Sequence, residues 1–320
     1  MSVLVFLDQA DGHIKKSSFE AANYAAKIAE QLGTSAEALI LGTVNDDLAA
    51  IGIYGIKKVH TVSDASLNNL DAQQYTKIIA QAVEATGADV IVFSNNTSGK
   101  AVAPRLSVRL KAGLVSGAIA LPDTTNGFTV KKTVFSGKAF ANITVNTEKK
   151  IIALNPNSYS IVTTGGTAEV VAFSASIDAA KVAVTQVNKV VGEVSLSEAE
   201  IVVSGGRGLK GPENWGMVTE LAGLLGAATA CSRPVADIHW RPHHEHVGQT
   251  GLAIAPNLYF AIGISGAIQH LAGVNRSKTI VVINKDPEAP FFKAADYGIV
   301  GDAFEVMPKI IEAVRKLKGA

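Results

Sequence analysis

The fold is decided by two neighbouring motifs, Val247-Gly-Gln-Thr-Gly251 and, after a spacer of seven residues, Tyr259-Phe-Ala-Ile-Gly-Ile-Ser-Gly-Ala-Ile-Gln-His270. An apolar strand, Leu258 to Ile262, gives way to the glycine turn 263–266 and then to the start of a helix at Ala267. Such a turn lets the backbone approach a ligand closely, and the N–H groups at a helix start favour a phosphate. The motif therefore predicts a phosphorylated ligand, although Gly-x-x-Gly alone fits a plain structural turn equally well.

Length and composition limit the class of protein. A chain of 320 residues with 48% hydrophobic and 18% charged residues predicts about two globular domains with buried strands. The net charge of +1 provides no basic field for nucleic acid. Cys231 is the only cysteine, which fits a reducing compartment and predicts a cytoplasmic protein. The opening strand at residues 2–7 shows no export signal, and no apolar run approaches the roughly 18 residues that span a bilayer, so we expect no membrane insertion.

The first half of the chain alternates strands and helices. Ser17 and Glu20 form the pattern of a capping box, and Gly33 stands where a left-handed residue ends a helix. Strands are expected at residues 3–7, 38–41, 58–62 and 90–93, and helices at residues 17–32, 71–85 and 101–110. Three further strands, at residues 128–134, 139–145 and 150–154, have short spacers rich in Gly, Thr and Asn, which predicts antiparallel hairpins.

Residues 174–200 are expected to form a linking arm with strand character, and a second β/α series follows. Its strands are expected at residues 200–204, 227–230, 258–262 and 279–283, and its helices at residues 214–225 and 303–317. The pattern predicts an α/β protein with one domain at residues 1–195 and a second, doubly wound parallel-sheet domain at residues 196–320.

Polar side chains follow each predicted strand of the second series. Arg207 lies in a glycine loop after the first strand, Ser232 and Arg233 follow the second, Ser265 follows the third, and Asn284 follows the fourth. Ligands bind at the carboxyl ends of strands in open parallel sheets, so these residues are expected to face one crevice. Taken singly, each residue fits an exposed loop position or a helix cap as well.

Several ordered motifs then give a specific resemblance. The motifs are Ser232-Arg233, Val247 to Gly251, Leu258-Tyr259, Gly263 to Gly273, Ile283 to Pro290 and Ala295 to Asp302. With these motifs the chain resembles the alpha subunits of electron-transfer flavoproteins, densely from about Glu200 to Pro308, whereas the first half matches that family only in β/α style and in its opening strand. The resemblance implies that the first domain has three layers and a nucleotide-hydrolase-like β/α fold with added hairpins.

The resemblance also implies a function and partners. One FAD would be bound mainly by residues 196–320, in a heterodimer whose beta subunit completes the site and holds an AMP. The complex would accept electrons from primary dehydrogenases and pass them singly to a quinone-reducing or other redox acceptor, without substrate turnover of its own. The donor, the acceptor and the pathway stay open, as does an electron-bifurcating branch with a second flavin in the beta subunit.

Carried over from the family, the FAD contacts include residues with a physical role in tuning the flavin. Arg233 would stabilise negative charge on the reduced ring, Thr250 would offer its hydroxyl near N5, and His270 would donate at the pyrimidine end. The turn at Ser265 and the helix start after it would hold phosphate and ribityl oxygens. The full set is Arg207, Ser232, Arg233, Val247, Gly248, Gln249, Thr250, Ser265, Gly266, Ala267, Ile268, Gln269, His270, Asn284, Asp302 and Ala303.

Residues 237–246 stand apart from this pattern, because four of the chain's seven histidines lie in Asp237-Ile-His-Trp-Arg-Pro-His-His-Glu-His246. A metal site is one interpretation, but a solvated or subunit-facing loop is preferred and no metal is expected, since the family uses none. The role of residues 239–246 stays open. A nicotinamide-dependent dehydrogenase is disfavoured, since neither glycine turn reads Gly-x-Gly-x-x-Gly, and a flavin-less partner module is disfavoured by the intact polar set.

Overall fold

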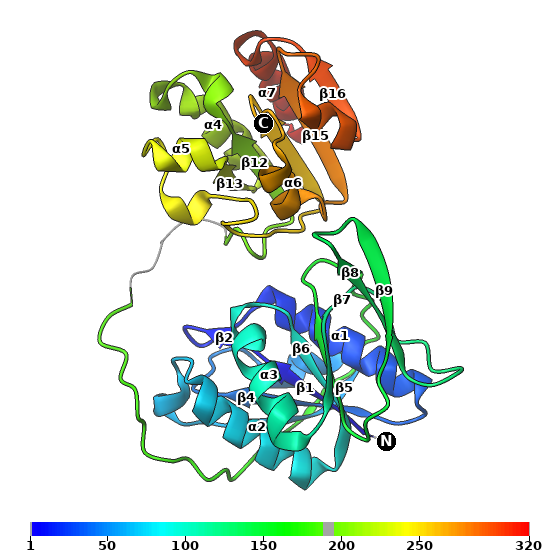
Figure 1. The fold of residues 1–320 in the computed structure, drawn as a ribbon. Helices are drawn as coiled ribbons and strands as arrows, with labels where there is room; N and C mark the ends of the chain where they lie inside the picture. Colours follow the sequence, from blue (N-terminus) through cyan, green and yellow to red (C-terminus); the bar gives the residue numbers. More distant parts are fainter. Residues whose placement is uncertain (1, 188–194, 320) are drawn as a thin grey trace. The chain divides into compact units, whose positions relative to one another are not determined.

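A computed structural model describes residues 2–187 and 195–319 of the chain. The chain divides into two compact units, unit 1 at residues 1–188 and unit 2 at residues 189–320 (Figure 1). The division falls within the residues that the structure leaves undescribed, and the boundary expected at residues 195 and 196 stays a prediction. Among the described residues, no helix has both the length and the apolar character to cross a bilayer.

Unit 1 is built on a sheet of nine strands in the order β11-β5-β4-β1-β6-β10-β7-β8-β9. The strands from β11 to β7 pair in parallel, and β8 and β9 add an antiparallel hairpin at one edge. The bounds are β1 Ser2–Leu7, β4 Ala36–Leu41, β5 Ile56–Val62, β6 Ala88–Ser94, β7 Gly113–Ala118, β8 Thr129–Val134, β9 Ala139–Thr144, β10 Lys150–Leu154 and β11 Glu169–Ala172, with a separate two-stranded ribbon of β2 Gln9–Ala10 and β3 His13–Ile14.

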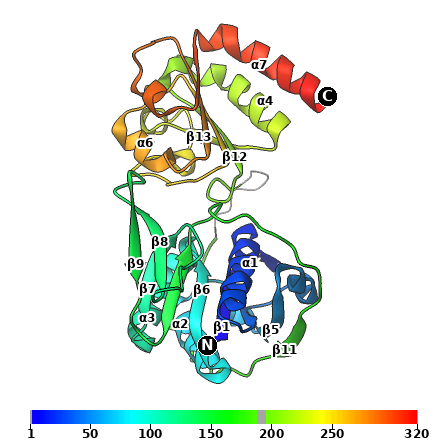
Figure 2. The same ribbon diagram turned by 90° about the vertical axis from the view of Figure 1, so that its right-hand side faces the viewer.

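Helices cover both faces of this sheet, which gives three layers (Figure 2). Alternate residues of β1 point to opposite faces, as the strand geometry requires. Val3 and Val5 pack with α1 (Lys16–Gln31), whereas Leu4 packs with α2 (Ala72–Thr86) and α3 (Thr97–Leu110). Each helix buries one apolar face, and Asp71 caps α2 by accepting from the backbone N–H groups of Gln73 and Gln74. The predicted three-layer β/α fold is therefore confirmed.

Three local predictions for unit 1 are wrong. Strand β10 is not part of a hairpin, because it lies parallel between β6 and β7. The capping box does not form, since α1 begins at Lys16 and the carboxylate of Glu20 accepts from the backbone N–H groups of residues 157–159. The arm shows no strand at residues 174–187, because the last strand of unit 1, β11, ends before the arm begins, at Ala172. Residues 188–194 of the predicted arm lie outside the described residues.

Unit 2 contains one parallel sheet of five strands in the order β13-β12-β14-β15-β16. Helices α4 and α7 contribute to the core on one face, and Val274 of α6 and Phe291 to the core on the other, as a doubly wound sheet requires. The bounds are β12 Ile201–Gly205, α4 Gly216–Leu225, β13 Ala228–Cys231, α5 Arg233–Asp237, β14 Leu258–Ile262, α6 Ile268–Val274, β15 Thr279–Asn284, β16 Tyr297–Val300 and α7 Ala303–Lys318. The predicted doubly wound domain is confirmed, and β16, α5 and the full length of α6 are additions to it.

Candidate functional site

A cavity of about 480 Å³ lies at the carboxyl ends of β12, β13, β14 and β15 in unit 2. This volume falls within the range of small-molecule and cofactor sites. Eleven of the sixteen predicted contact residues line the cavity, and each of the four predicted strand ends contributes at least one of them. The eleven are Arg207, Ser232, Arg233, Val247, Gln249, Thr250, Ser265, Ala267, Gln269, His270 and Asn284.

Glycines let two loops touch in the wall of this cavity. The N–H of Gly208 donates to the carbonyl of Gly263 over 3.0 Å, and a Cβ on Gly208 would lie 2.7 Å from the Gly263 Cα. Gly263 has a φ of 63°, and Gly266, two residues beyond Ile264, has a φ of 84°. A Cβ on Gly266 would lie 2.5 Å from the Cβ of Phe291, so a side chain there would push the turn off its support. The turn is thus fixed by backbone contact.

The run from Val247 to Thr250 forms a second wall. Val247 makes a parallel bridge to Leu252, and the N–H of Gln249 donates to the carbonyl of Gln269 over 2.7 Å. Gly248 does not line the cavity, because its backbone packs against Gly273 of α6, where a Cβ would lie 2.4 Å from the Gly248 nitrogen. The loop is therefore tied to α6 by main-chain contacts, which leaves the side chains of Gln249 and Thr250 exposed.

His270 is the most deeply buried titratable group of the cavity wall, with 7% of its surface exposed. Its Nε2 lies 2.8 Å from the Tyr259 hydroxyl, and its Nδ1 has no hydrogen-bond partner among the described residues. Burial, reinforced by the nearby His246, lowers the pKa of His270 to about 4. The nearby Val247 backbone acts in the opposite direction and raises this pKa, although it does not form a hydrogen bond with the Nδ1 of His270. The imidazole is therefore neutral near pH 7.

Two arginines give the cavity its positive charge. Arg233 begins α5, and its Nε lies 3.3 Å from Oδ2 of Asp237 one turn later, with 61% of the arginine side chain exposed. Arg207 begins the short 3₁₀ turn η3 (Arg207–Leu209) after β12. The hydroxyl of Ser232 precedes α5 without capping it. These guanidinium and hydroxyl groups suit phosphate oxygens or negative charge on a conjugated ring.

The other predicted contact residues lie outside this cavity. Asp302 and Ala303 line a neighbouring cavity of about 40 Å³ at the start of α7. The Asp302 carboxylate caps α7 by accepting from the N–H of Phe304. The backbone of Gly266 packs on Phe291, and Ile268 is 58% exposed. Asn284 lines both cavities, and its amide donates to the carbonyl of Ile264 over 3.0 Å.

The structure also brings to the cavity residues that are not among the predicted contacts, including His246, Asp286 and Ala289. In the predicted loop at residues 237–246, His243 and His244 are exposed, as expected of a solvated segment. His246 is 8% exposed because a parallel bridge to Cys231 holds it against the sheet, and burial lowers its pKa. No cluster of three or more metal-ligating side chains occurs in residues 2–187 or 195–319. The position of this histidine, directly before the Val247–Gly251 motif, was the signal that could have identified it.

Comparisons with known proteins agree with this geometry. The model of the electron transfer flavoprotein domain matches residues 3–178, and that of the electron transfer flavoprotein FAD-binding domain matches residues 195–275. The electron transfer flavoprotein subunit alpha of Bacillus subtilis is 38% identical over 98% of each chain. The subunit alpha of Syntrophomonas wolfei is 37% identical over 98% of each chain, and that of Thermoanaerobacterium thermosaccharolyticum is 35% identical over 99% of this chain and 98% of its own. The chain therefore belongs to the electron transfer flavoprotein alpha-subunit family, carries that family's FAD-binding domain, and serves in electron transfer.

Proposed function

We propose that this chain is the FAD-holding half of a heterodimeric electron carrier that takes electrons from primary dehydrogenases and passes them singly to a downstream redox acceptor. The observation that carries the proposal is the cavity of about 480 Å³, where two arginines, a neutral imidazole and several side-chain amides and hydroxyls meet at strand ends. When bound, FAD supplies a ring that can take up and release electrons one at a time. The single cysteine of the chain supports a cytoplasmic location for this carrier.

The donor set of the cavity fits both ends of a flavin dinucleotide. The turn at Ser265, with the start of α6 behind it, is suited to hold phosphate and ribityl oxygens through backbone N–H groups. Arg233, Thr250 and His270 are assigned to the ring. Arg233 would stabilise added negative charge there, and the neutral imidazole of His270 would contribute a dipole without a charge of its own.

The partner in this proposal is a beta subunit that completes the site and holds AMP. Support comes from the relatives, which are named as alpha subunits and which this chain matches over nearly its whole length. The polar walls of the cavity, with exposed Gln249 and Thr250, leave surface for a second subunit to contact. The chain would then bind, orient and shield the cofactor without making or breaking a substrate bond.

The test is reconstitution of the complex. The chain is co-expressed with its beta subunit, stripped of cofactor and titrated with FAD, and we expect a yellow complex that binds one FAD per heterodimer. Absorption spectra and the phosphate content of the released nucleotides report FAD and AMP separately. A correctly folded heterodimer that stays colourless in excess FAD would refute the proposal. A stable chain that loads fully with FAD on its own would refute the shared site.

A further inference from the structure

Tyr259 supports the cavity from inside the sheet. It lies on the central strand β14 between Val202 and Ile280, and none of its surface is exposed. Its ring stacks on Phe291 at 6.3 Å, and Phe291 in turn meets the imidazole of His270 edge-on at 5.7 Å. The phenol and the imidazole are therefore held on one shared aromatic support, with the Tyr259 hydroxyl 2.8 Å from Nε2 of His270.

The direction of this hydrogen bond follows from the groups available. Burial raises the pKa of Tyr259, so its hydroxyl stays protonated and must donate to an acceptor. Ser204 lies beside the phenol, but its hydroxyl makes no hydrogen bond of accepted geometry, so His270 Nε2 is the acceptor that the described residues provide. The reverse direction would leave the buried phenol proton without an acceptor. With Nε2 accepting, the imidazole proton sits on Nδ1.

We propose that Tyr259 is a positioning residue that holds His270 neutral, as the Nδ1–H tautomer, in the wall of the cofactor cavity. The role of Tyr259 toward FAD rests on the proposed function, whereas the tautomer itself does not. The Nδ1–H then faces the Val247 backbone, where the loop bearing Gln249 and Thr250 begins, so His270 would act on the flavin through its dipole and not as the hydrogen-bond donor expected from the sequence. Tyr259 thereby links β14, through α6, to the loop that is assigned to the flavin ring.

The environment of His270 favours the neutral form from each side. Besides Tyr259, His246 is the one titratable or charged side chain that acts on His270 in the described part of the chain. Its effect disfavours a positive charge on the His270 ring. Phe291 offers an apolar edge, and Val247 a backbone contact. A donated hydrogen bond at Nε2 also stabilises the unprotonated nitrogen. The positive charge near the flavin would then come from Arg207 and Arg233, not from His270.

The first test reads the tautomer without FAD. The chain is labelled with ¹⁵N in its histidine rings and placed in the apo heterodimer, and His270 is assigned by comparison with His270→Gln. We expect a protonated Nδ1 and an unprotonated Nε2 from pH 8 down to about 5, below the ordinary histidine pKa of about 6.5. In Tyr259→Phe, both tautomers should be populated and the titration should move to higher pH. An Nε2–H tautomer in the unaltered chain, or a Tyr259→Phe spectrum unchanged from it, overturns the proposal.

The second test measures the consequence for FAD. Tyr259→Phe keeps the ring packing and removes one buried hydrogen bond, so we expect the Kd for FAD to rise about fivefold. Tyr24→Phe is the matched control, because Tyr24 is a buried tyrosine of unit 1 whose hydroxyl donates to the Ala120 carbonyl over 2.8 Å. That variant should leave the Kd and the His270 spectrum unchanged. An unaltered Kd in Tyr259→Phe overturns the positioning role, whereas absence of FAD binding by the unaltered complex would count against the proposed function and leave the tautomer assignment standing.

Discussion

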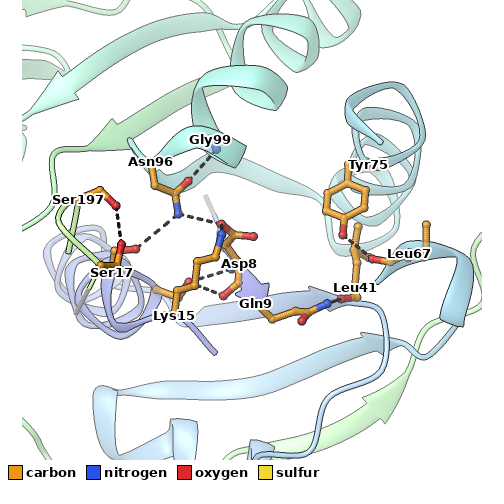
Figure 3. Close-up of polar contacts among 12 residues, drawn as sticks. Asp8, Gln9, Lys15, Ser17, Leu41, Leu67, Tyr75, Asn96, Gly99 and Ser197 are labelled. Atoms are coloured by element: carbon orange, nitrogen blue, oxygen red, sulfur yellow. Dashed lines mark hydrogen bonds and ion pairs between the residues drawn. The ribbon is translucent and has the colours of Figure 1, made fainter. Parts of the chain in front are cut away.

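The two units place polar residues at the carboxyl ends of parallel strands in the same way, but they use them differently. In unit 1 the carboxylate of Asp8, which follows β1, accepts from Lys15 over 2.7 Å and from Asn96 over 2.9 Å (Figure 3). Asn96 in turn caps α3 by accepting from the N–H of Gly99. These polar groups satisfy one another. In unit 2 the corresponding strand ends leave a cavity of about 480 Å³ and an unpartnered Nδ1 on His270.

The difference indicates what leaves a strand end open to a ligand. Position alone is shared by both units, since buried parallel sheets deliver loops to the same edge. In unit 2, Gly208 and Gly263 touch through their backbones and the turn at Gly266 rests on Phe291, and these loops border the cavity. A ligand at this edge would be able to bond to the polar groups that line the cavity.

The largest effect is expected from placing a side chain at Gly266, where the turn rests on Phe291. In Gly266→Ala the new Cβ meets Phe291 and the φ of 84° becomes strained, so we expect loss of FAD binding and about 3 kcal/mol less stability for unit 2. The measurements are FAD titration of the complex and chemical unfolding followed by tryptophan fluorescence, since Trp215 and Trp240 are the only tryptophans and both lie in unit 2. Gly226→Ala is the control: its φ is 62° and a Cβ would meet nothing within 4 Å, so it should cost about 1 kcal/mol and keep FAD. Equal losses in both variants would contradict the role of the Phe291 contact.

The next effect is a pH dependence confined to unit 2. His270 has a pKa of about 4 in the folded chain and about 6.5 when unfolded, so between these values the unfolded state binds a proton that the folded state does not. Stability should therefore fall as the pH drops from 6.5 to 4, by about 3 kcal/mol, and then level off. Tryptophan-detected unfolding measures this slope, and His270→Gln should remove most of it. His60→Gln in unit 1, which loses the contact to Glu37, is the control and should leave the slope intact. If the slope is unchanged in His270→Gln, the pH dependence comes from another group.

The fold was predictable where patterns are local. The strand at Leu258–Ile262 has the predicted bounds, and α2 carries its apolar face and its Asp71 cap as the periodicity indicates. Strand β10 shows the limit, because hydrophobicity identifies a strand but does not identify its neighbours. Its pairing with β6 and β7 joins segments far apart in the chain. The predicted capping box does not form for a related reason, because the Glu20 carboxylate accepts hydrogen bonds from a loop far away in the sequence.

The candidate site was predictable to a similar depth. The strand-end rule identified Arg207, Ser232 and Asn284, and the structure places all three around one cavity. It does not place Gly248 there, since that residue serves main-chain packing on Gly273. His246 was overlooked because its histidine-rich surroundings indicate a solvated loop. Its burial depends on the bridge to Cys231, a contact between two segments that local pattern does not show.

A smaller effect is expected from removing the carboxylate at the centre of the unit 1 cluster of Asp8, Lys15 and Asn96. Asp8→Ala removes the acceptor of Lys15 and Asn96 in a mostly buried setting, so we expect unit 1 to lose about 2 kcal/mol. Far-ultraviolet circular dichroism follows the unfolding of the whole chain, and tryptophan fluorescence follows unit 2. The fluorescence transition and the Kd for FAD should not move. Glu30→Ala, which removes the exposed partner of Lys27 in unit 1, is the control and should cost less than Asp8→Ala. A weakened Kd in Asp8→Ala would show that the cluster of unit 1 also serves the cofactor.

The smallest effect in free energy concerns Arg233, and it separates binding from tuning. Its side chain is 61% exposed and pairs with Asp237, so Arg233→Ala should leave the stability of unit 2 nearly unchanged. A fixed positive charge beside the ring stabilises the reduced flavin, so its loss should lower the potential of the first electron step by about 60 mV, which is about 1.4 kcal/mol for one electron. Arg315→Ala is the control, because Arg315 is similarly exposed, pairs with Glu220 and does not line the cavity. A spectroelectrochemical titration distinguishes the two variants. If Arg233→Ala and Arg315→Ala have equal flavin potentials, Arg233 does not act on the flavin ring.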